Sequence, residues 1–167
     1  MPLVILTGAS GSGKTTLAKA VSQRVGESVD VHFFDSIDIP SFEEMSAQQG
    51  SIENWQRVKT KEWLHRLAPA AEQGEGVLFE GQMRIAFIEE ALAAAAISEP
   101  RIILVDCSDE ERLRRLNDER HQPELANPQM INWAKYLRTE ALQGGHEILD
   151  TSARSVADCA AHLSRYF

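Results

Sequence analysis

The stretch VILTGASGSGKTTLAKAV, residues 4–21, places three glycines, two serines and a lysine between two apolar runs. Glycine loses more conformational freedom on folding than any other residue, so such a cluster needs a local reason. The stretch matches the pattern G-x-x-x-x-G-K-[ST] through Gly8, Gly13, Lys14 and Thr15. A strand-like run precedes the pattern and a helical one follows, which is the context that a phosphate-binding loop requires. We therefore predict such a loop between the first strand and the first helix.

In a loop of this kind, successive backbone N–H groups and the helix N-terminus form a positive cradle for phosphate oxygens. A side chain at Gly11 or Gly13 would prevent close approach. Lys14 is expected to neutralise the β- and γ-phosphates of a nucleoside triphosphate, and the Thr15 hydroxyl to ligate Mg²⁺. The predicted nucleotide-binding residues of the loop are Gly8, Ala9, Ser10, Gly11, Ser12, Gly13, Lys14, Thr15 and Thr16.

Composition limits the remaining possibilities. The 167 residues are 43% hydrophobic, which predicts one domain with a real core. A net charge of -8 disfavours nucleic acid or an anionic membrane as partner. Cys107 and Cys159 fit no metal spacing and no disulfide framework. The first residues lack the charged region of a signal peptide. We expect a single domain over residues 1–167 in the cytoplasm.

Elsewhere the chain alternates between two patterns. Apolar, β-branched runs predict strands at Leu3–Thr7, Val29–Phe34, Val77–Phe79, Arg101–Asp106 and Glu147–Leu149. Helical patterns cover Lys14–Val25, Ser51–Ala68, Ile85–Ile97, a segment capped by Ser108, a segment from Asn127 to Gly144, and Ser155–Phe167. Strands alternating with helices predict an α/β fold with a parallel sheet covered on both faces. In the helix after Ser108 we expect Glu110–Arg114 and Glu111–Arg115 ion pairs.

The phosphate-binding loop alone does not define a reaction. The chain has no NKxD or DxxG motif of GTPase switches, and it lacks the length and further signatures of transporter and motor ATPases. Small kinases remain, and these need an acceptor site and a cover over the nucleotide.

Two segments supply candidate acceptor residues. FFDSID places Asp35 just past the second strand, where a carboxylate can take a proton from an acceptor hydroxyl or orient the Mg²⁺ shell through water. Asp38 is a second candidate. VLFEGQMR ends the third strand with Glu80, which is placed to hold metal-bound water, and continues to Arg84, whose planar fork suits an anionic acceptor.

Arginines after the fourth strand are candidates for the cover. Arg120 stands at the end of its helix and is the preferred residue to stabilise charge on the transferring phosphoryl group, followed by Arg115. Arg138 on the next helix is a further substrate-binding candidate. Trp55 and Trp63 lie on similar helix faces and either stack on an acceptor or pack beneath the cover.

These segments together resemble the P-loop nucleoside/nucleotide kinase superfamily over nearly the whole chain. GASGSGKTT is similar to the loops of gluconate and uridine kinases. EGQMR resembles the DGxxR segment of nucleotide kinases, with Glu80 in place of Asp and Arg84 matching the acceptor-binding arginine. FDSID resembles a stretch of chloramphenicol phosphotransferase whose Asp is the base, which corresponds to Asp35. ILDTSARSVADCAAHL is similar to the final strand and helix, where the loop at Asp150–Ala153, with Ser152, would border the adenine.

The resemblance implies a three-layer fold with a five-stranded parallel sheet in the order 2-3-1-4-5. It also implies ATP with Mg²⁺ and a short arginine-bearing lid, at approximately residues 117–128. The acceptor would bind in a helical region at approximately residues 36–70.

The sequence hypothesis is transfer of the γ-phosphoryl group of ATP to a small-molecule hydroxyl by a monomer or homodimer. A phosphate acceptor needs no base because it is already largely ionised near neutral pH, so Asp35 favours a hydroxyl. A nucleoside monophosphate kinase and a regulatory or toxin-like nucleotide-binding module are the alternatives. Predicted roles are catalytic for Lys14, Asp35 and Arg120, metal-binding for Thr15 and Glu80, nucleotide-binding for Arg115 and Ser152, and substrate-binding for Asp35, Asp38, Trp55, Arg84 and Arg138.

Overall fold

A computed structural model describes residues 3–97 and 99–167. Its centre is one sheet of five parallel strands in the order β2-β3-β1-β4-β5. The strands are β1 (Leu3–Thr7), β2 (Val29–Phe33), β3 (Gly76–Glu80), β4 (Arg101–Asp106) and β5 (Glu147–Asp150). The predicted α/β class and strand order are confirmed.

The central strand β1 is buried at every position. Leu3 and Ile5 belong to one hydrophobic core, and Val4 and Leu6 belong to a second core on the other face. A strand covered on both faces needs a continuous apolar run rather than alternation, and this is the pattern that precedes the phosphate-binding loop.

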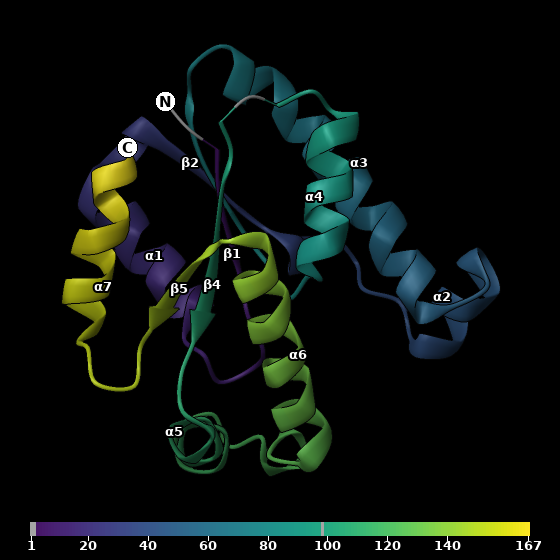
Figure 1. The fold of residues 1–167 in the computed structure, drawn as a ribbon, viewed down its shortest axis with the longest axis vertical. Helices are drawn as coiled ribbons and strands as arrows, with labels where there is room; N and C mark the ends of the chain where they lie inside the picture. The colour runs from purple at the N-terminus through teal and green to yellow at the C-terminus, as the bar shows by residue number, and fades with distance from the viewer. Residues whose placement is uncertain (1–2, 98) are drawn as a thin grey trace.

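Helices cover both faces of the sheet (Figure 1). α1 (Lys14–Val25) and α7 (Val156–Leu163) lie on one side, and α3 (Ile52–Glu72), α4 (Ile85–Ala94) and α6 (Pro128–Gly144) on the other. α2 (Phe42–Gln49) projects from the body beyond α3, and α5 (Asp109–Arg114) lies beyond the end of β4. The fold is the three-layer arrangement expected of a P-loop kinase.

Helix boundaries differ from expectation at four places. The last helix, expected to reach Phe167, ends at Leu163 and is followed by a 3₁₀ turn at Ser164–Tyr166. α2 was not predicted as a separate helix, although its N-terminus has a capping box between Ser41 and Glu44. α3 continues past Ala68 to Glu72 with Pro69 inside it. α4 ends at Ala94 instead of Ile97.

The segment after α5 is irregular. Residues 115–119 form a wider π turn, a geometry that often marks functional sites in helices, and a short 3₁₀ turn follows at Pro123–Leu125. The expected Glu110–Arg114 ion pair is wrong, because Arg114 pairs with Glu111 and Glu119 instead. Arg115 pairs with Glu111 as expected, with 2.8 Å between Nε and Oε1. None of the described helices is long and apolar enough to cross a membrane.

Candidate active site

The phosphate-binding loop leaves the carboxyl end of β1 and enters α1. Gly11 and Gly13 have φ angles of +80° and +93°, in the left-handed region that favours glycine. At Gly8, a Cβ atom would lie 2.3 Å from the carbonyl oxygen of Val105 on β4. At Gly11, it would lie 3.1 Å from Cγ of Arg112. Clearance for a ligand is therefore not the sole reason for the glycines, because the loop's own backbone and packing also require them.

Lys14, Thr15 and Glu80 form the centre of the site. Lys14 is the first residue of α1 and is only 8% exposed. Its Nζ lies 3.9 Å from Oε1 of Glu80, and the Thr15 hydroxyl donates to Oε2 of Glu80 at 3.1 Å. Glu80 is the last residue of β3, which pairs with β1, so parallel pairing brings its carboxylate beside the loop.

Burial shifts both charged groups toward their neutral forms. It lowers the pKa of Lys14, whereas the charge of Glu80 acts in the opposite direction. Burial also raises the pKa of Glu80, and this rise is partly offset by Lys14 and by the hydrogen bond from Thr15. Both charges are incompletely solvated, so an anion at Lys14 and a cation at Glu80 would each be stabilised.

The donor set at Thr15 and Glu80 fits Mg²⁺. A hydroxyl and a carboxylate are oxygen ligands, and Mg²⁺ takes few protein ligands when it also binds water and substrate phosphates. The described residues contain no cluster of three or more His, Cys, Asp or Glu arranged for a metal. A site completed by phosphate and water is therefore the kind of magnesium site that these residues suit.

Asp35 and Arg120 approach this centre from two separate segments. Asp35 lies in a 3₁₀ turn, Phe34–Ser36, directly after β2. Its charge raises the pKa of both Lys14 and Glu80, and the charge of Arg120 lowers both. Both side chains are exposed. Asp35 and Arg120 thus each lie close enough to Lys14 to act on it electrostatically.

Two cavities adjoin the loop. The first, of about 270 Å³, extends from Gly13, Lys14 and Thr15 to Arg120. The second, of about 230 Å³, lies beyond Gly13 on the side of α1 and α7, and its walls include Thr16, Leu17, Arg115, Thr151, Arg154 and Val156.

The loop after β5 borders the second cavity through Thr151, which belongs to the expected segment Asp150–Ala153, but not through Ser152. Ser152 instead accepts a hydrogen bond from the N–H of Ser108 at 2.7 Å, at the start of α5. Arg154 and Val156 line the cavity and were missed, because neither belongs to a local motif. Arg115, a predicted nucleotide-binding residue, lines both cavities.

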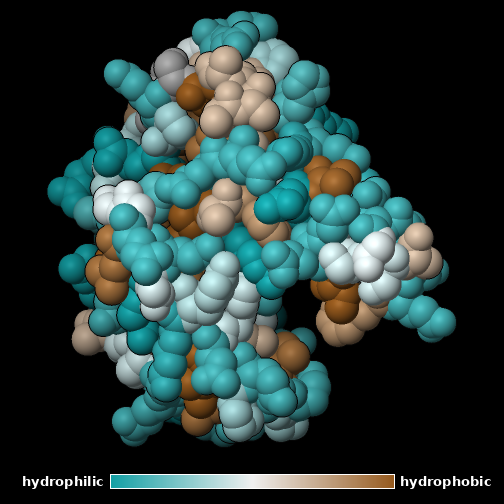
Figure 2. Space-filling view, turned by 45° about the vertical axis from the view of Figure 1, so that its right-hand side comes forward, coloured by the Kyte–Doolittle hydropathy of each residue, from teal (hydrophilic) through white to brown (hydrophobic). Residues whose placement is uncertain are grey.

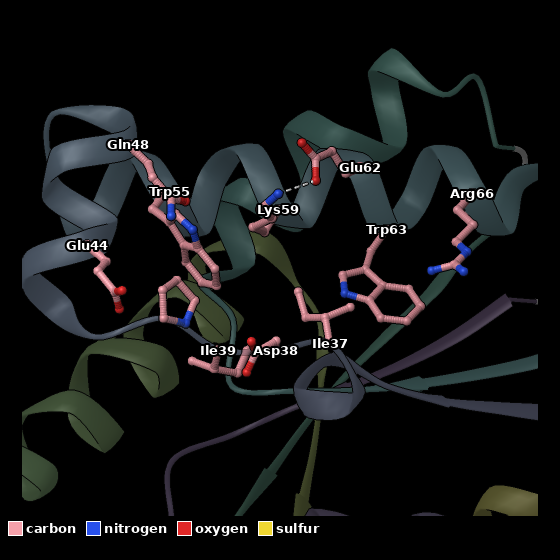
Figure 3. Close-up of a pocket in the computed structure, with 11 residues that line it drawn as sticks. Ile37, Asp38, Ile39, Glu44, Gln48, Trp55, Lys59, Glu62, Trp63 and Arg66 are labelled. Atoms are coloured by element: carbon pink, nitrogen blue, oxygen red, sulfur yellow. Dashed lines mark hydrogen bonds and ion pairs between the residues drawn. The ribbon is translucent and has the colours of Figure 1, made fainter.

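A larger cavity, of about 540 Å³, lies between the segment after β2, α2 and α3. Figure 3 shows its walls: Trp55, Lys59 and Trp63 of α3 face the segment containing Asp38, and α2 contributes side chains at one end. Six of its eleven lining residues are polar or charged, namely Asp38, Glu44, Gln48, Lys59, Glu62 and Arg66. This cavity falls within the region predicted for the acceptor.

The two tryptophans have a packing role as well as a place in this wall. Trp63 packs on Phe79 of β3 with ring centroids 5.2 Å apart, and Trp55 meets Phe34 edge-on at 6.2 Å. Both are almost completely buried in the core. Beside the cavity, hydrophobic surface gathers on the lower side of the projecting α2 region, next to a hollow (Figure 2).

Arg84 and Arg138 lie apart from the larger cavity. Arg84 donates to Oε1 of Gln56 at 3.0 Å, and its guanidinium lies 5.0 Å from the ring centroid of Trp133. It borders a different cavity, of about 360 Å³, with Glu53 and Tyr136. Arg138 donates to Oδ2 of Asp106 at 2.7 Å. Of the predicted substrate-binding residues, Asp38 and Trp55 share a cavity, and these two arginines do not line it.

Sequence reasoning missed the residues that support the loop. Arg112 is completely buried and contacts both Asp106 and the loop, and Thr151 contacts the loop from the end of β5. Arg112 stands among other charged residues of a helix, so its sequence context favours exposure. A polar residue at the end of a buried strand, as at Asp106, was the one available signal.

Comparisons with known proteins bear on the family and the fold of the chain. Residues 4–131 match the model of a protein family described as AAA domain. No curated protein matches the sequence.

Solved structures resemble the fold along 99% of the chain. A sugar kinase from Janibacter sp. HTCC2649 is 15% identical, with a TM-score of 0.73 over 94% of its own chain. The tunicamycin resistance protein of Deinococcus radiodurans is 16% identical, with a TM-score of 0.66 over 95% of its chain. Shikimate kinase from Acinetobacter baumannii, solved with shikimate, is 15% identical, with a TM-score of 0.61 over 92% of its chain.

Proposed function

The chain belongs to the AAA domain family, and we propose that it transfers the γ-phosphoryl group of ATP to a hydroxyl of a small molecule. The observation that carries this proposal is the meeting of Lys14, Thr15 and Glu80 at the phosphate-binding loop, within electrostatic reach of Asp35 and Arg120. A module that only binds nucleotide has no need of a base and an exposed cation beside the terminal phosphate.

In this proposal the 270 Å³ cavity holds the phosphates and the 230 Å³ cavity holds the adenine. Loop N–H groups and Lys14 bind the β- and γ-phosphates. Thr15 binds Mg²⁺ directly and Glu80 binds it directly or through water; the ion supplies charge neutralisation on the phosphates. Arg120, in the proposed lid of residues 117–128, stabilises charge on the transferring group and excludes water.

Asp35 is proposed as the base. It accepts the proton of the acceptor hydroxyl as that oxygen bonds to the γ-phosphorus. The bond between the γ-phosphorus and the bridging oxygen breaks, and ADP leaves with that electron pair. The protein's contribution is mainly positioning and charge compensation, because phosphoryl transfer needs little covalent help.

The acceptor is proposed to bind in the 540 Å³ cavity. Carboxylates at Asp38 and Glu44 accept hydrogen bonds, and Lys59 and Arg66 donate them. A small molecule with several hydroxyl groups can use both kinds of partner. The solved structures with this fold include proteins named as sugar kinase, gluconokinase and shikimate kinase, which supports a small hydroxylated acceptor. Arg84 is held by Gln56 outside this cavity, which weighs against a nucleoside monophosphate as acceptor.

The test is acceptor-dependent ADP release from Mg·ATP, measured across sugars, sugar acids, cyclic alcohols and nucleoside monophosphates. We expect turnover with a hydroxylated acceptor. Lys14→Ala should abolish it, and Asp35→Asn should suppress it while ATP still binds. Turnover with monophosphates alone, or normal transfer by Asp35→Asn, would refute the hydroxyl mechanism. ATP binding without turnover across this panel would favour a regulatory module.

A further inference from the structure

Side chains outside the phosphate-binding loop donate hydrogen bonds to its carbonyl oxygens. Arg112 donates from Nη1 to the carbonyl oxygen of residue 10 at 2.8 Å. Arg115 donates from Nη1 to the carbonyl oxygens of residues 11 and 12 at 3.2 and 3.3 Å. The Thr151 hydroxyl donates to the carbonyl oxygen of residue 12 at 2.8 Å. Three successive peptide groups therefore have their oxygen atoms fixed on one side of the loop.

Fixing the oxygens also fixes the N–H groups. In a trans peptide the C=O and N–H bonds point in opposite directions, and the described part of the chain has no cis peptide. The held carbonyls of residues 10 and 12 thus direct the N–H groups of Gly11 and Gly13 away from the arginines. Neither N–H meets an acceptor among the described residues. Both remain available to bind phosphate.

Asp106 connects this support to a distant helix. It is the last residue of β4, and its side chain is 7% exposed. Its Oδ1 accepts from Nη2 of Arg112 at 2.6 Å, and its Oδ2 accepts from Nε of Arg138 on α6 at 2.7 Å. Its carbonyl oxygen accepts from the N–H of Thr151 at 2.9 Å. One residue thus contacts the inner arginine, the support from β5 and the helix that follows the proposed lid.

We propose that Asp106 is a positioning residue that couples the placement of α6 to the affinity of the phosphate-binding loop for nucleotide. The coupling runs from Arg138 through the Asp106 carboxylate to Arg112, and from Arg112 to the carbonyl of Ser10. It deepens the proposed function and rests on the nucleotide site assigned there. No residue of this chain of contacts other than Ser10 needs to touch the ligand.

Differences in burial indicate which contact is adjustable. The Arg112 side chain has no exposed surface, whereas that of Arg138 is 36% exposed. Loss of the Arg138 contact frees one carboxylate oxygen of Asp106 and lets that side chain turn, which loosens its hold on Arg112. Because α6 begins directly after the segment that carries Arg120, movement of the lid displaces this outer contact first. Coupling of this kind is reciprocal, so nucleotide binding should in turn restrain α6.

The test is nucleotide affinity in Arg138→Gln, measured by calorimetry with Mg·ATP and separately with inorganic tripolyphosphate. We expect about five- to tenfold weaker binding of both ligands, because the loop itself is altered. Arg138→Lys should restore part of the affinity. In amide hydrogen exchange, ATP should slow exchange in α6 of the original protein and lose this effect in Arg138→Gln.

Glu90→Gln is the matched control. Glu90 also accepts ion pairs from two cations, Arg57 at 3.1 Å and Lys61 at 2.5 Å, but it lies on α4 away from the loop. The affinity of the Glu90→Gln variant for ATP should be unchanged. Asp106→Asn leaves a buried guanidinium without its carboxylate and is expected to destabilise the fold, so the weaker Arg138 substitution is the primary variant.

Equal affinity of Arg138→Gln and the original protein for ATP would overturn the coupling. So would weakening confined to ATP, since Arg138 would then act on the nucleoside instead of the loop. If folded Asp106→Asn is obtained, the double variant Asp106→Asn/Arg138→Gln should bind ATP no more weakly than Asp106→Asn alone. If the two substitutions instead weaken ATP binding by independent factors, Arg138 does not act through Asp106. Failure of the original protein to bind ATP would refute the proposed function itself, and absence of transfer with intact binding would leave the coupling test valid.

Discussion

Lys14 and Glu80 show how one pair of side chains prepares a site for ligands of both charges. They lie 3.9 Å apart, and burial moves the pKa of each toward its neutral form. A close pair of this kind attracts but remains incompletely solvated. A triphosphate at Lys14 and a divalent cation at Glu80 would replace the interactions with water that burial has removed from these two side chains. The residues are therefore prearranged for charge that arrives with the substrate.

The lowered pKa of Lys14 predicts proton uptake on nucleotide binding at alkaline pH. In the free protein, a neutral fraction of Lys14 develops below the ordinary pKa of 10.5, and bound phosphates favour the ammonium form. Between the two pKa values binding takes up a proton, so the affinity for ATP falls as pH rises through this range. Calorimetry in buffers of different ionisation enthalpy measures the uptake.

Lys14→Arg is the control, because its guanidinium stays charged throughout this range and should remove the uptake. For the free protein, the sign is opposite: the unfolded chain binds more protons than the folded one here, so this lysine favours folding more as pH rises. An ATP affinity independent of alkaline pH would contradict the assignment.

At the scale of single residues, the sequence predicted those site residues whose positions are determined by a local motif. Lys14, Thr15 and Glu80 stand at strand and helix ends that the spacing alone locates. Arg112 and Asp106 were missed because their importance lies in contacts with Ser10 and Arg138, which are remote in the sequence.

At the scale of elements, the turn after β3 and the turn after β2 fix each other. A Cβ atom on Gly81 would lie 2.5 Å from Cβ of Phe34, the buried residue directly before Asp35. The close approach of these two backbones sets where the proposed base stands.

Gly81→Ala is therefore expected to displace the turn that carries Asp35. We expect turnover to fall at least about tenfold, because a small misplacement of a catalytic group is costly, while the affinity for ATP changes little. Steady-state kinetics and calorimetry measure the two effects. Gly26→Ala serves as control, since its φ of +63° is strained for alanine but its Cβ would meet nothing within 4 Å. Unchanged turnover would show that Phe34 does not set the position of Asp35.

Helix α2 depends on its capping box. The N–H of Ser41 donates to Oε2 of Glu44 at 2.8 Å, and the N–H of Glu44 donates to Oγ of Ser41 at 3.3 Å. The first of these hydrogen bonds lowers the pKa of Glu44. The hydrogen bond to the Glu44 carboxylate is present at neutral pH and is lost as pH falls through that lowered pKa, whereas the bond to Oγ of Ser41 remains.

Ser41→Ala should loosen α2 and with it one wall of the acceptor cavity. We expect KM for the acceptor to rise several-fold, of the order of the effect of a lost N-cap, with KM for ATP unchanged. Ser155→Ala removes the equivalent cap of α7 on the other face of the sheet and should leave KM for the acceptor unaltered. If both variants raise KM for the acceptor equally, the effect is general destabilisation rather than a change in α2.

For the whole molecule, the parallel order of strands collects residues 14, 35, 80 and 120 at one edge of the sheet. The alternation of apolar runs with helical patterns predicted the parallel sheet, and the resemblance to P-loop kinases implied the order of its strands. The sequence did not predict that the candidate acceptor-binding residues would be divided between two cavities. Trp55 and Asp38 share one cavity, whereas Arg84 borders another and donates a hydrogen bond to Gln56.

The placement of the tryptophans has a practical outcome. Trp55 and Trp63 line the 540 Å³ cavity and Trp133 the 360 Å³ cavity, and none lines the two cavities beside the loop. The intrinsic fluorescence of the native protein should therefore report acceptors much more strongly than ATP. A library of metabolites can be screened by emission without a label or turnover, and Trp55→Phe, Trp63→Phe and Trp133→Phe then assign each signal to its cavity. If the emission change on adding an acceptor disappears only in Trp133→Phe, the acceptor binds in the 360 Å³ cavity beside Arg84.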